Sequence, residues 1–169
     1  MTNENLKIAQ ANPPDIVPIM DLIRKAVKAM NDSGLYQWSE AYPNEEIITE
    51  DIAAGTLYKI TVDASIAGII VINHQYFPEY NALKWEDNAG RFLMIHRLCI
   101  HPDYQGQGLA KILMQFAEAY AVRNQYTSIR LDTGTLNTKA LALYDGLGYR
   151  RVGVVSFRPG GFQVFEKVL

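Results

Sequence analysis

Two glycines separate an apolar segment from a helical pattern near the middle of the chain. The run Ile95–Ile100 is apolar enough to predict a strand, and Gly106 and Gly108 follow it. Apolar residues then recur at the spacing of one helix face, at Leu109, Ile112, Leu113, Phe116, Ala117 and Tyr120. A helix that begins after a glycine leaves its first N–H groups uncapped, and the helix dipole makes them attractive to an anion. The segment therefore predicts a strand, a phosphate-binding loop and a helix in succession.

Two common phosphate-binding motifs do not fit this loop. The spacing Gly-x-x-x-x-Gly-Lys-Ser/Thr is absent, and Lys111 stands where the third glycine of Gly-x-Gly-x-x-Gly would fall. The pattern that does occur is Gln105-x-x-Gly108-x-Ala110. In its strand–loop–helix setting, this pattern resembles the acetyl-CoA pyrophosphate loop of the GNAT superfamily of N-acetyltransferases.

Composition limits the class of protein. With 169 residues, 49% of them hydrophobic, the chain can form one domain with a substantial core, and we expect a single domain over residues 1–169. A net charge of −2 gives no field that would attract nucleic acid or an anionic membrane. The segment Met1–Lys7 lacks the apolar core of a signal peptide, and no apolar run approaches membrane-spanning length, so we expect a cytoplasmic protein. A single cysteine excludes an internal disulfide and a thiolate zinc cluster.

The rest of the sequence predicts strands and helices without a repeat or a linker. The predicted strands are Leu6–Ala9, Leu57–Val62, Ser65–Ile72, Arg91–Ile100, Ser128–Asp132, Tyr149–Val155 and Gly161–Val168. The predicted helices are Pro13–Ser33, Asn44–Ala54, Gly106–Asn124 and Asn137–Leu147. This order predicts an α/β class. It resembles the GNAT fold from end to end, in which a mixed central sheet with splayed central strands is flanked by helices.

The resemblance implies that acetyl-CoA is the co-substrate and that three parts of the chain bind it. The pyrophosphate loop would comprise Gln105, Gly106, Gln107, Gly108, Leu109 and Ala110. In GNAT enzymes a bulge in the central strand frees main-chain groups for the pantetheine arm, which implies this role for Leu98, Cys99 and Ile100. An ordinary buried strand fits these three residues equally well. Asn137 would bind the donor through its amide, cap the following helix, or do both.

Tyr144 is the predicted general acid. It lies in Asn137-x-x-Ala…Tyr144-x-x-x-Gly-Tyr149, which resembles a second GNAT signature. A phenol with its ordinary pKa near 10 is protonated at neutral pH and can protonate a departing CoA thiolate. The alternative is a core aromatic, because Tyr144 shares a helix face with Ala140, Leu143 and Leu147.

His96 is the predicted general base. Serotonin N-acetyltransferase and its arylalkylamine relatives also carry a histidine on this strand, and imidazole is well suited to accept the proton of an ammonium group. The strand has no Glu, the residue that many GNAT enzymes use there, so water and a purely structural histidine remain as alternatives. Cys99 is expected to be buried and unreactive.

Aromatic residues outside the glycine loop are the predicted walls of an acceptor pocket. They suit an amine with an apolar body or a cation held over a ring, although they could equally pack loops onto the core. Asp132 could hold the positive charge of the amine or cap the loop that follows it. The predicted acceptor-binding residues are Trp38, Tyr42, Tyr80, Trp85 and Asp132.

The resemblance to the GNAT superfamily implies an N-acyltransferase that passes an acetyl group from acetyl-CoA to a primary amine by direct attack in a ternary complex. The acceptor is a small molecule or a peptide amine, and the sequence leaves a homodimer open. No metal is expected, since the three histidines lack ligand spacing. Two alternatives use the same loop: a non-catalytic acyl-CoA-binding regulatory module, and a protein that binds ATP.

Overall fold

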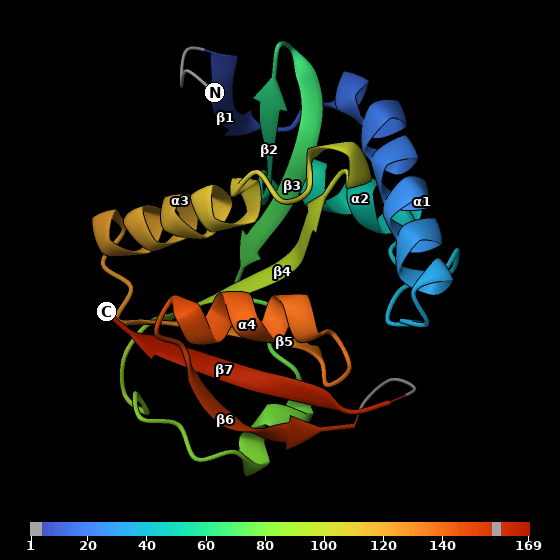
Figure 1. Ribbon diagram of the computed structural model, residues 1–169. Coiled ribbons are helices and arrows are strands. Elements are labelled where there is room, and N and C mark those ends of the chain that lie inside the picture. The colour runs from blue at the N-terminus through green and yellow to red at the C-terminus, as the bar shows by residue number, and fades with distance from the viewer. Residues whose placement is uncertain (1–4, 157–159) are drawn as a thin grey trace. The chain divides into compact units, whose positions relative to one another are not determined.

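The computed structural model describes residues 5–156 and 160–169. Its mixed sheet has seven strands in the order β1-β2-β3-β4-β5-β7-β6. The strands are β1 (Leu6–Gln10), β2 (Leu57–Val62), β3 (Ser65–Asn73), β4 (Phe92–Ile100), β5 (Ser128–Gly134), β6 (Arg150–Val155) and β7 (Phe162–Val168) (Figure 1). The α-helices are α1 (Ile16–Asp32), α2 (Glu45–Ala53), α3 (Leu109–Arg123) and α4 (Thr138–Gly146). The predicted α/β class is confirmed, and each predicted strand and helix is present.

The chain divides into two compact units. The first contains the described residues up to Ile72 together with Arg97–Gln115, and the second contains Asn73–His96 and the described residues from Phe116 onward. Strand β4 therefore contributes its first half to the second unit and its last four residues to the first.

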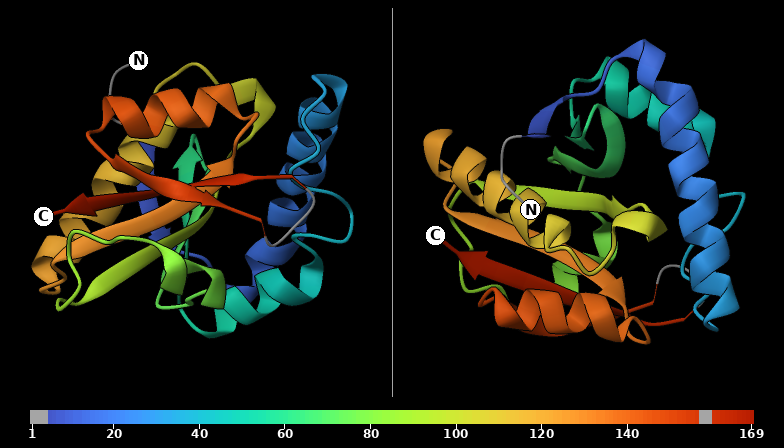
Figure 2. Two further views of the ribbon diagram at one scale, coloured as in Figure 1. Left: turned by 90° about the horizontal axis from the view of Figure 1, so that it is seen from below. Right: turned by 45° about the horizontal axis from the view of Figure 1, so that its top comes forward.

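In the first unit, α1 and α2 share a hydrophobic core with β2 and β3. The hairpin of β2 and β3 turns at Asp63 and Ala64, whose φ values of 47° and 68° suit a tight turn between antiparallel strands. Helix α2 lies beside α1 in both views of Figure 2. The buried side chains of α1 are Ile19, Leu22, Ile23, Ala26 and Val27. Asn44 caps α2 by accepting a hydrogen bond from the N–H of Ile47 at 3.0 Å.

Two predicted helix starts are corrected. The segment Pro13–Asp15 forms a 3₁₀ helix, and α1 begins only at Ile16. Helix α3 begins at Leu109 instead of Gly106, because Gly106 and Gly108 have φ values of 76° and 80°. These left-handed values are incompatible with a right-handed helix, so both glycines belong to the loop.

In the second unit, α4 packs on β5 and β7 (Figure 1). Strand β7 pairs antiparallel with β5 from Ser128↔Val168 to Gly134↔Phe162, and β6 pairs antiparallel with β7 at its other edge. The parallel pairing of β4 with β5 joins Phe92–Met94 to Ser128–Arg130 and is three residues long. A ladder this short agrees with the splayed central strands that the family resemblance implies.

Candidate active site

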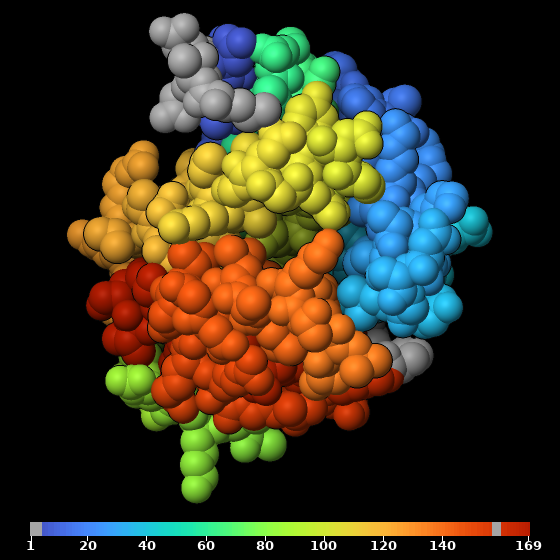
Figure 3. Space-filling view, in the orientation of Figure 1, coloured from blue at the N-terminus to red at the C-terminus, as the bar shows by residue number. Residues whose placement is uncertain are grey.

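The glycine loop of the first unit has the geometry of an anion site. Residues Gln105–Gly108 are exposed, and Figure 3 shows the yellow segment that contains them at the surface. The N–H of Ile112 donates to the carbonyl of Gly108 at 3.1 Å, so the first internal hydrogen bond of α3 starts at a residue with no side chain. By helix geometry, the N–H groups of the preceding turn have no acceptor within the helix. A Cβ built on Gly106 or Gly108 would meet no heavy atom within 4 Å. The loop therefore offers backbone donors beside open space.

Strand β4 contains a left-handed residue immediately before the residues predicted to bind pantetheine. Arg97 has a φ of 50°, which is left-handed for a residue with a Cβ. Leu93–Arg97 are all buried, so both faces of the strand are covered up to this point. The family resemblance implies a bulge in this strand, and a left-handed φ is a conformation that bulge residues adopt, so Arg97 is the candidate bulge residue.

The strand after the bulge lies close to β3 and to the glycine loop. A Cβ on Gly68 of β3 would come within 3.0 Å of the carbonyl oxygen of Cys99, so only glycine allows this approach. The N–H of His101 donates to the carbonyl of Ala67 at 2.8 Å. The side chain of Gln105 donates to the carbonyl of Ile100 at 3.3 Å. Gln105 thus links the loop to the end of the strand.

Arg97 forms a buried ion pair that sequence reasoning did not find. Its Nε and Nη2 donate to the two carboxylate oxygens of Asp51 in α2 at 2.7 and 2.8 Å. Its Nη1 donates to the hydroxyl of Tyr42 at 2.9 Å. Burial raises the pKa of Asp51, and the hydrogen bonds from Arg97 oppose that rise. A charged residue inside an apolar strand was the available signal, because a buried guanidinium requires a partner.

In the second unit, Asn137 and Tyr144 occupy opposite ends of α4. The side-chain oxygen of Asn137 accepts a hydrogen bond from the N–H of Ala140 at 3.2 Å, so the capping role is confirmed. Tyr144 is 5% exposed, and its ring lies edge-on to Phe165 and Tyr149 at centroid distances of 5.4 and 6.1 Å. The ring therefore belongs to the core, and its role as an acid stays a prediction.

Asp132 affects the pKa of Tyr144 and accepts a hydrogen bond from Tyr80. Burial raises the pKa of the Tyr144 phenol, and the nearby charge of Asp132 raises it further. The hydroxyl of Tyr80 donates to the Asp132 carboxylate. These effects keep the Tyr144 phenol protonated at neutral pH, which is the state that a general acid requires.

His96 and Cys99 are both buried. The ring of His96 lies edge-on to Phe77 at a centroid distance of 5.9 Å, within the second unit. Cys99 joins the hydrophobic core of the first unit, and burial raises the pKa of its thiol to about 12. A thiol with this pKa is protonated at neutral pH, so the expectation of an unreactive cysteine is supported.

Three of the aromatic residues predicted for the acceptor pocket are buried. Trp38 is 8% exposed in the core of the first unit. Tyr80 and Trp85 are 0% and 9% exposed in a hydrophobic cluster of the second unit, and Trp85 donates from Nε1 to the carbonyl of Tyr80 at 3.1 Å. Tyr42 is half-buried with its hydroxyl on Arg97. Packing accounts for Trp38, Tyr80 and Trp85, and their contact with an acceptor stays a prediction.

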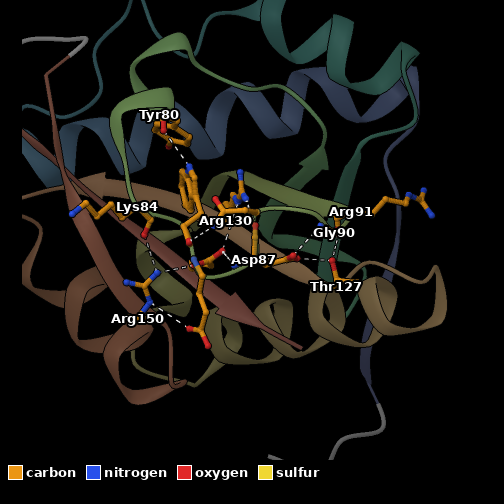
Figure 4. Close-up of polar contacts among 12 residues, drawn as sticks. Tyr80, Lys84, Asp87, Gly90, Arg91, Thr127, Arg130 and Arg150 are labelled. Atoms are coloured by element: carbon orange, nitrogen blue, oxygen red, sulfur yellow. Dashed lines mark hydrogen bonds and ion pairs between the residues drawn. The ribbon is translucent and has the colours of Figure 1, made fainter.

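Arg130 fixes the aromatic loop onto β5, as Figure 4 shows. Its guanidinium lies 3.9 Å from the centroid of the Trp85 ring and 4.1 Å from that of Phe92. Its Nη2 donates to the carbonyl of Asp87 at 2.7 Å. Arg130 therefore covers the face of Trp85 that an amine cation could otherwise use.

Glu166 of β7 also anchors this loop. Its carboxylate accepts the backbone N–H groups of Glu86 and Asp87 at 2.8 and 3.1 Å. It also accepts a hydrogen bond from Nη2 of Arg150 at 2.9 Å (Figure 4). Since Glu166 is 1% exposed, these bonds compensate for the removal of its charge from water.

Residues 5–156 and 160–169 contain neither a candidate metal cluster nor a candidate membrane-spanning helix. This part of the chain contains no group of three or more His, Cys, Asp or Glu side chains placed to hold a metal ion. None of its helices combines the length and the hydropathy needed to cross a membrane.

Comparison with known proteins gives concordant matches. The model of the acetyltransferase (GNAT) family matches residues 22–149. The uncharacterized N-acetyltransferase YesJ of Bacillus subtilis is 26% identical over 159 residues, which cover 90% of this chain and 84% of YesJ. A GNAT-family acetyltransferase from Streptococcus agalactiae has a TM-score of 0.83 and 27% identity, with coverage of 97% of this chain and 95% of that chain.

A more distant structure shares the fold. The protein yncA of Salmonella typhimurium, solved with its cofactor acetyl-CoA, has a TM-score of 0.73 and 14% identity, with coverage of 98% of this chain and 95% of that chain. The family model matches most of the chain, and the seven-stranded mixed sheet agrees with it. Together they decide to which family the chain belongs. The chain belongs to the GNAT family of acetyltransferases and is an acyltransferase.

Proposed function

We propose that this protein transfers an acetyl group from acetyl-CoA to a primary amine of a small molecule or a peptide. The observation that carries the proposal is the glycine loop, in which Gly106 and Gly108 are left-handed and open space lies where their Cβ atoms would be. Backbone N–H groups at the start of α3 can approach a pyrophosphate there without obstruction by a side chain. The distant fold relative that holds acetyl-CoA supports the same donor.

The residues that would hold acetyl-CoA fit its chemistry. The N–H groups of Leu109 and Ala110 in the first turn of α3, together with the loop, would bind the pyrophosphate oxygens. The main-chain groups of Leu98–Ile100 would pair with the amides of the pantetheine arm, as one strand pairs with another. When bound, acetyl-CoA supplies a thioester whose carbonyl carbon the amine attacks and whose sulfur leaves as a thiolate.

The chain's own groups would then move two protons and stabilise one oxygen. A main-chain N–H of β4 polarises the carbonyl oxygen of the thioester. The Tyr144 hydroxyl, kept neutral by burial and by Asp132, donates its proton to the departing sulfur. His96 or a water molecule accepts the proton that the attacking amine loses.

Thiol release tests the proposal directly. Purified protein is mixed with acetyl-CoA and a panel of small primary amines and peptides, and free CoA thiol is measured over time. We expect release that depends on the amine and an acetylated product of matching mass. If the protein binds CoA by calorimetry and no amine stimulates release, the non-catalytic acyl-CoA-binding module is the correct reading. Displacement of CoA by ATP would instead favour a nucleotide-binding protein.

The role of His96 predicts a pH profile. If His96 accepts the proton of the amine, kcat/KM rises with pH through a limb in the range where histidine ordinarily titrates, about 6 to 7. His96→Gln keeps a polar side chain of similar size that cannot accept a proton. The variant should therefore lose this limb and keep only the higher titration of the amine itself.

The same measurement separates His96 from its alternatives. A structural histidine predicts a lower Tm for His96→Gln together with an unmoved pH profile. Identical profiles in the wild type and the variant would exclude His96 as the base, and deprotonation would then be assigned to water.

A further inference from the structure

Arg97 adopts a backbone conformation that its side chain disfavours. A φ of 50° brings the Cβ of an L-residue close to the backbone, and glycine alone adopts it freely. Such a conformation persists in a folded protein only where the surroundings hold it in place. The outlier lies inside β4, directly before the three residues proposed to pair with the pantetheine arm.

Arg97 is held in place by three hydrogen bonds that its guanidinium donates. Asp51 receives two of them, at 2.7 and 2.8 Å, in the bidentate arrangement that fixes the plane of the group. The Tyr42 hydroxyl accepts the third, at 2.9 Å. The side chains of Arg97 and Asp51 are only 5% and 10% exposed, so water competes weakly for these bonds. We refer to Arg97, Asp51 and Tyr42 as the bulge clamp.

The direction of the chain after Arg97 decides which way the next backbone groups face. Successive residues of a strand alternate, and a residue with positive φ rotates the peptide groups that follow it. Beyond the bulge, the carbonyl of Cys99 lies against Gly68, and the carbonyl of Ile100 receives the side chain of Gln105. The orientation of Leu98–Ile100 is thus tied to β3 on one side and to the glycine loop at its end.

We propose that Arg97 is a positioning residue for the acyl donor, and that the bulge clamp holds its left-handed backbone so that those main-chain groups of Leu98–Ile100 that do not contact β3 or Gln105 face the pantetheine arm. This inference rests on the proposed function. It assigns a purpose to an ion pair that would otherwise serve only stability. A buried pair is weak support for stability in itself, because desolvation of both charges offsets most of their attraction.

Two substitutions separate the effect of the backbone conformation of Arg97 from the effect of losing its ion pair. Arg97→Ala and Arg97→Gly both remove the guanidinium and leave Asp51 equally unpaired, but only glycine adopts a positive φ without strain. We expect the Kd for CoA, measured by calorimetry well below both unfolding midpoints, to rise about tenfold in Arg97→Ala and to stay within about threefold of wild type in Arg97→Gly. In an ordinary extended strand, alanine would be the better tolerated residue.

A suppressor variant gives a second test that does not depend on Arg97→Ala being well folded. Asp51→Asn weakens the bulge clamp while Arg97 stays in place, and the Kd for CoA should rise. Adding Arg97→Gly should bring the Kd back toward the wild-type value. A purely structural ion pair predicts no such recovery of binding by the double variant.

The outcomes separate this inference from the proposed function. If the wild type does not bind CoA, the proposed function fails and the inference fails with it. If the wild type binds CoA, and either Arg97→Ala and Arg97→Gly bind it equally or the double variant does not recover, the inference alone is wrong. The Tm of each variant reports the stability contribution separately.

Discussion

Replacing Tyr144 with phenylalanine is expected to lower kcat by about 100-fold or more, the usual scale of a lost acid–base contribution. The substitution keeps the ring that packs on Phe165 and Tyr149 and removes only the hydroxyl. Without this proton donor, the CoA sulfur must leave as an unprotonated thiolate. The affinity for CoA should stay near the wild-type value, because the pyrophosphate loop is unchanged. Steady-state rates at saturating acetyl-CoA, together with calorimetry, measure both quantities.

Tyr149→Phe is a matched control for this experiment. Tyr149 is also a buried tyrosine, 4% exposed, and its ring is a direct neighbour of the Tyr144 ring. Removal of its hydroxyl tests the effect of deleting one polar atom from the same cluster. We expect Tyr149→Phe to turn over near the wild-type rate. If Tyr144→Phe does the same, Tyr144 is a core aromatic and another group protonates the sulfur.

The pKa of Tyr144 adds a pH dependence to this prediction. Burial and the charge of Asp132 both raise the pKa of Tyr144, so the phenol loses its proton only above its ordinary value near 10. A general acid works in its protonated form, so the Tyr144 contribution to kcat is complete below that pH and is lost above it. Asp132→Asn removes the neighbouring charge and should move this loss to lower pH. An alkaline limb at the same pH in the wild type and in Asp132→Asn would contradict the contribution of Asp132 to the pKa of Tyr144, of which burial is the larger cause.

The order of the elements was predictable because each one buries a periodic apolar face. Helix α1 follows the spacing of Ile19, Ile23 and Val27, and the hairpin turn at Asp63–Ala64 falls between two apolar runs. The helix boundaries were less predictable. Helix α3 was placed too early because the apolar pattern does not record the φ of Gly106 and Gly108, and it is φ that decides where a helix can begin.

Some features of the candidate site were likewise predictable from the sequence, and others were not. The glycine loop and the cap at Asn137 depend on local chemistry, which the sequence carries. The partner of Arg97 is Asp51, 46 positions away, and no local pattern connects the two. The predicted aromatic pocket shows a further limit of prediction from sequence. The segment around Trp85 has no helical or strand periodicity, yet Trp85 is buried against Arg130. Composition alone does not separate rings that line a pocket from rings that fasten a loop.

Gly108→Val is expected to weaken CoA binding at least about tenfold, which corresponds to about 1.4 kcal/mol. Gly108 has a φ of 80°, and the volume beside its Cα is open. Valine would place a branched side chain in that volume, where a pyrophosphate oxygen would lie against the backbone. Valine also resists a positive φ, so the loop would tend to leave the conformation that aims its N–H groups at the ligand.

Backbone strain alone could lower affinity by loosening the protein, and Gly34→Val controls for it. Gly34, beyond the end of α1, has a φ of 83° and likewise no heavy atom within 4 Å of an added Cβ. Valine there imposes the same conformational strain outside the loop. Both variants should lose stability to urea by similar amounts, while Gly108→Val alone should show the raised Kd for CoA in calorimetry. Equal dissociation constants in the two variants would mean that the glycine loop does not bind the pyrophosphate, and the donor would have to be held by other parts of the chain.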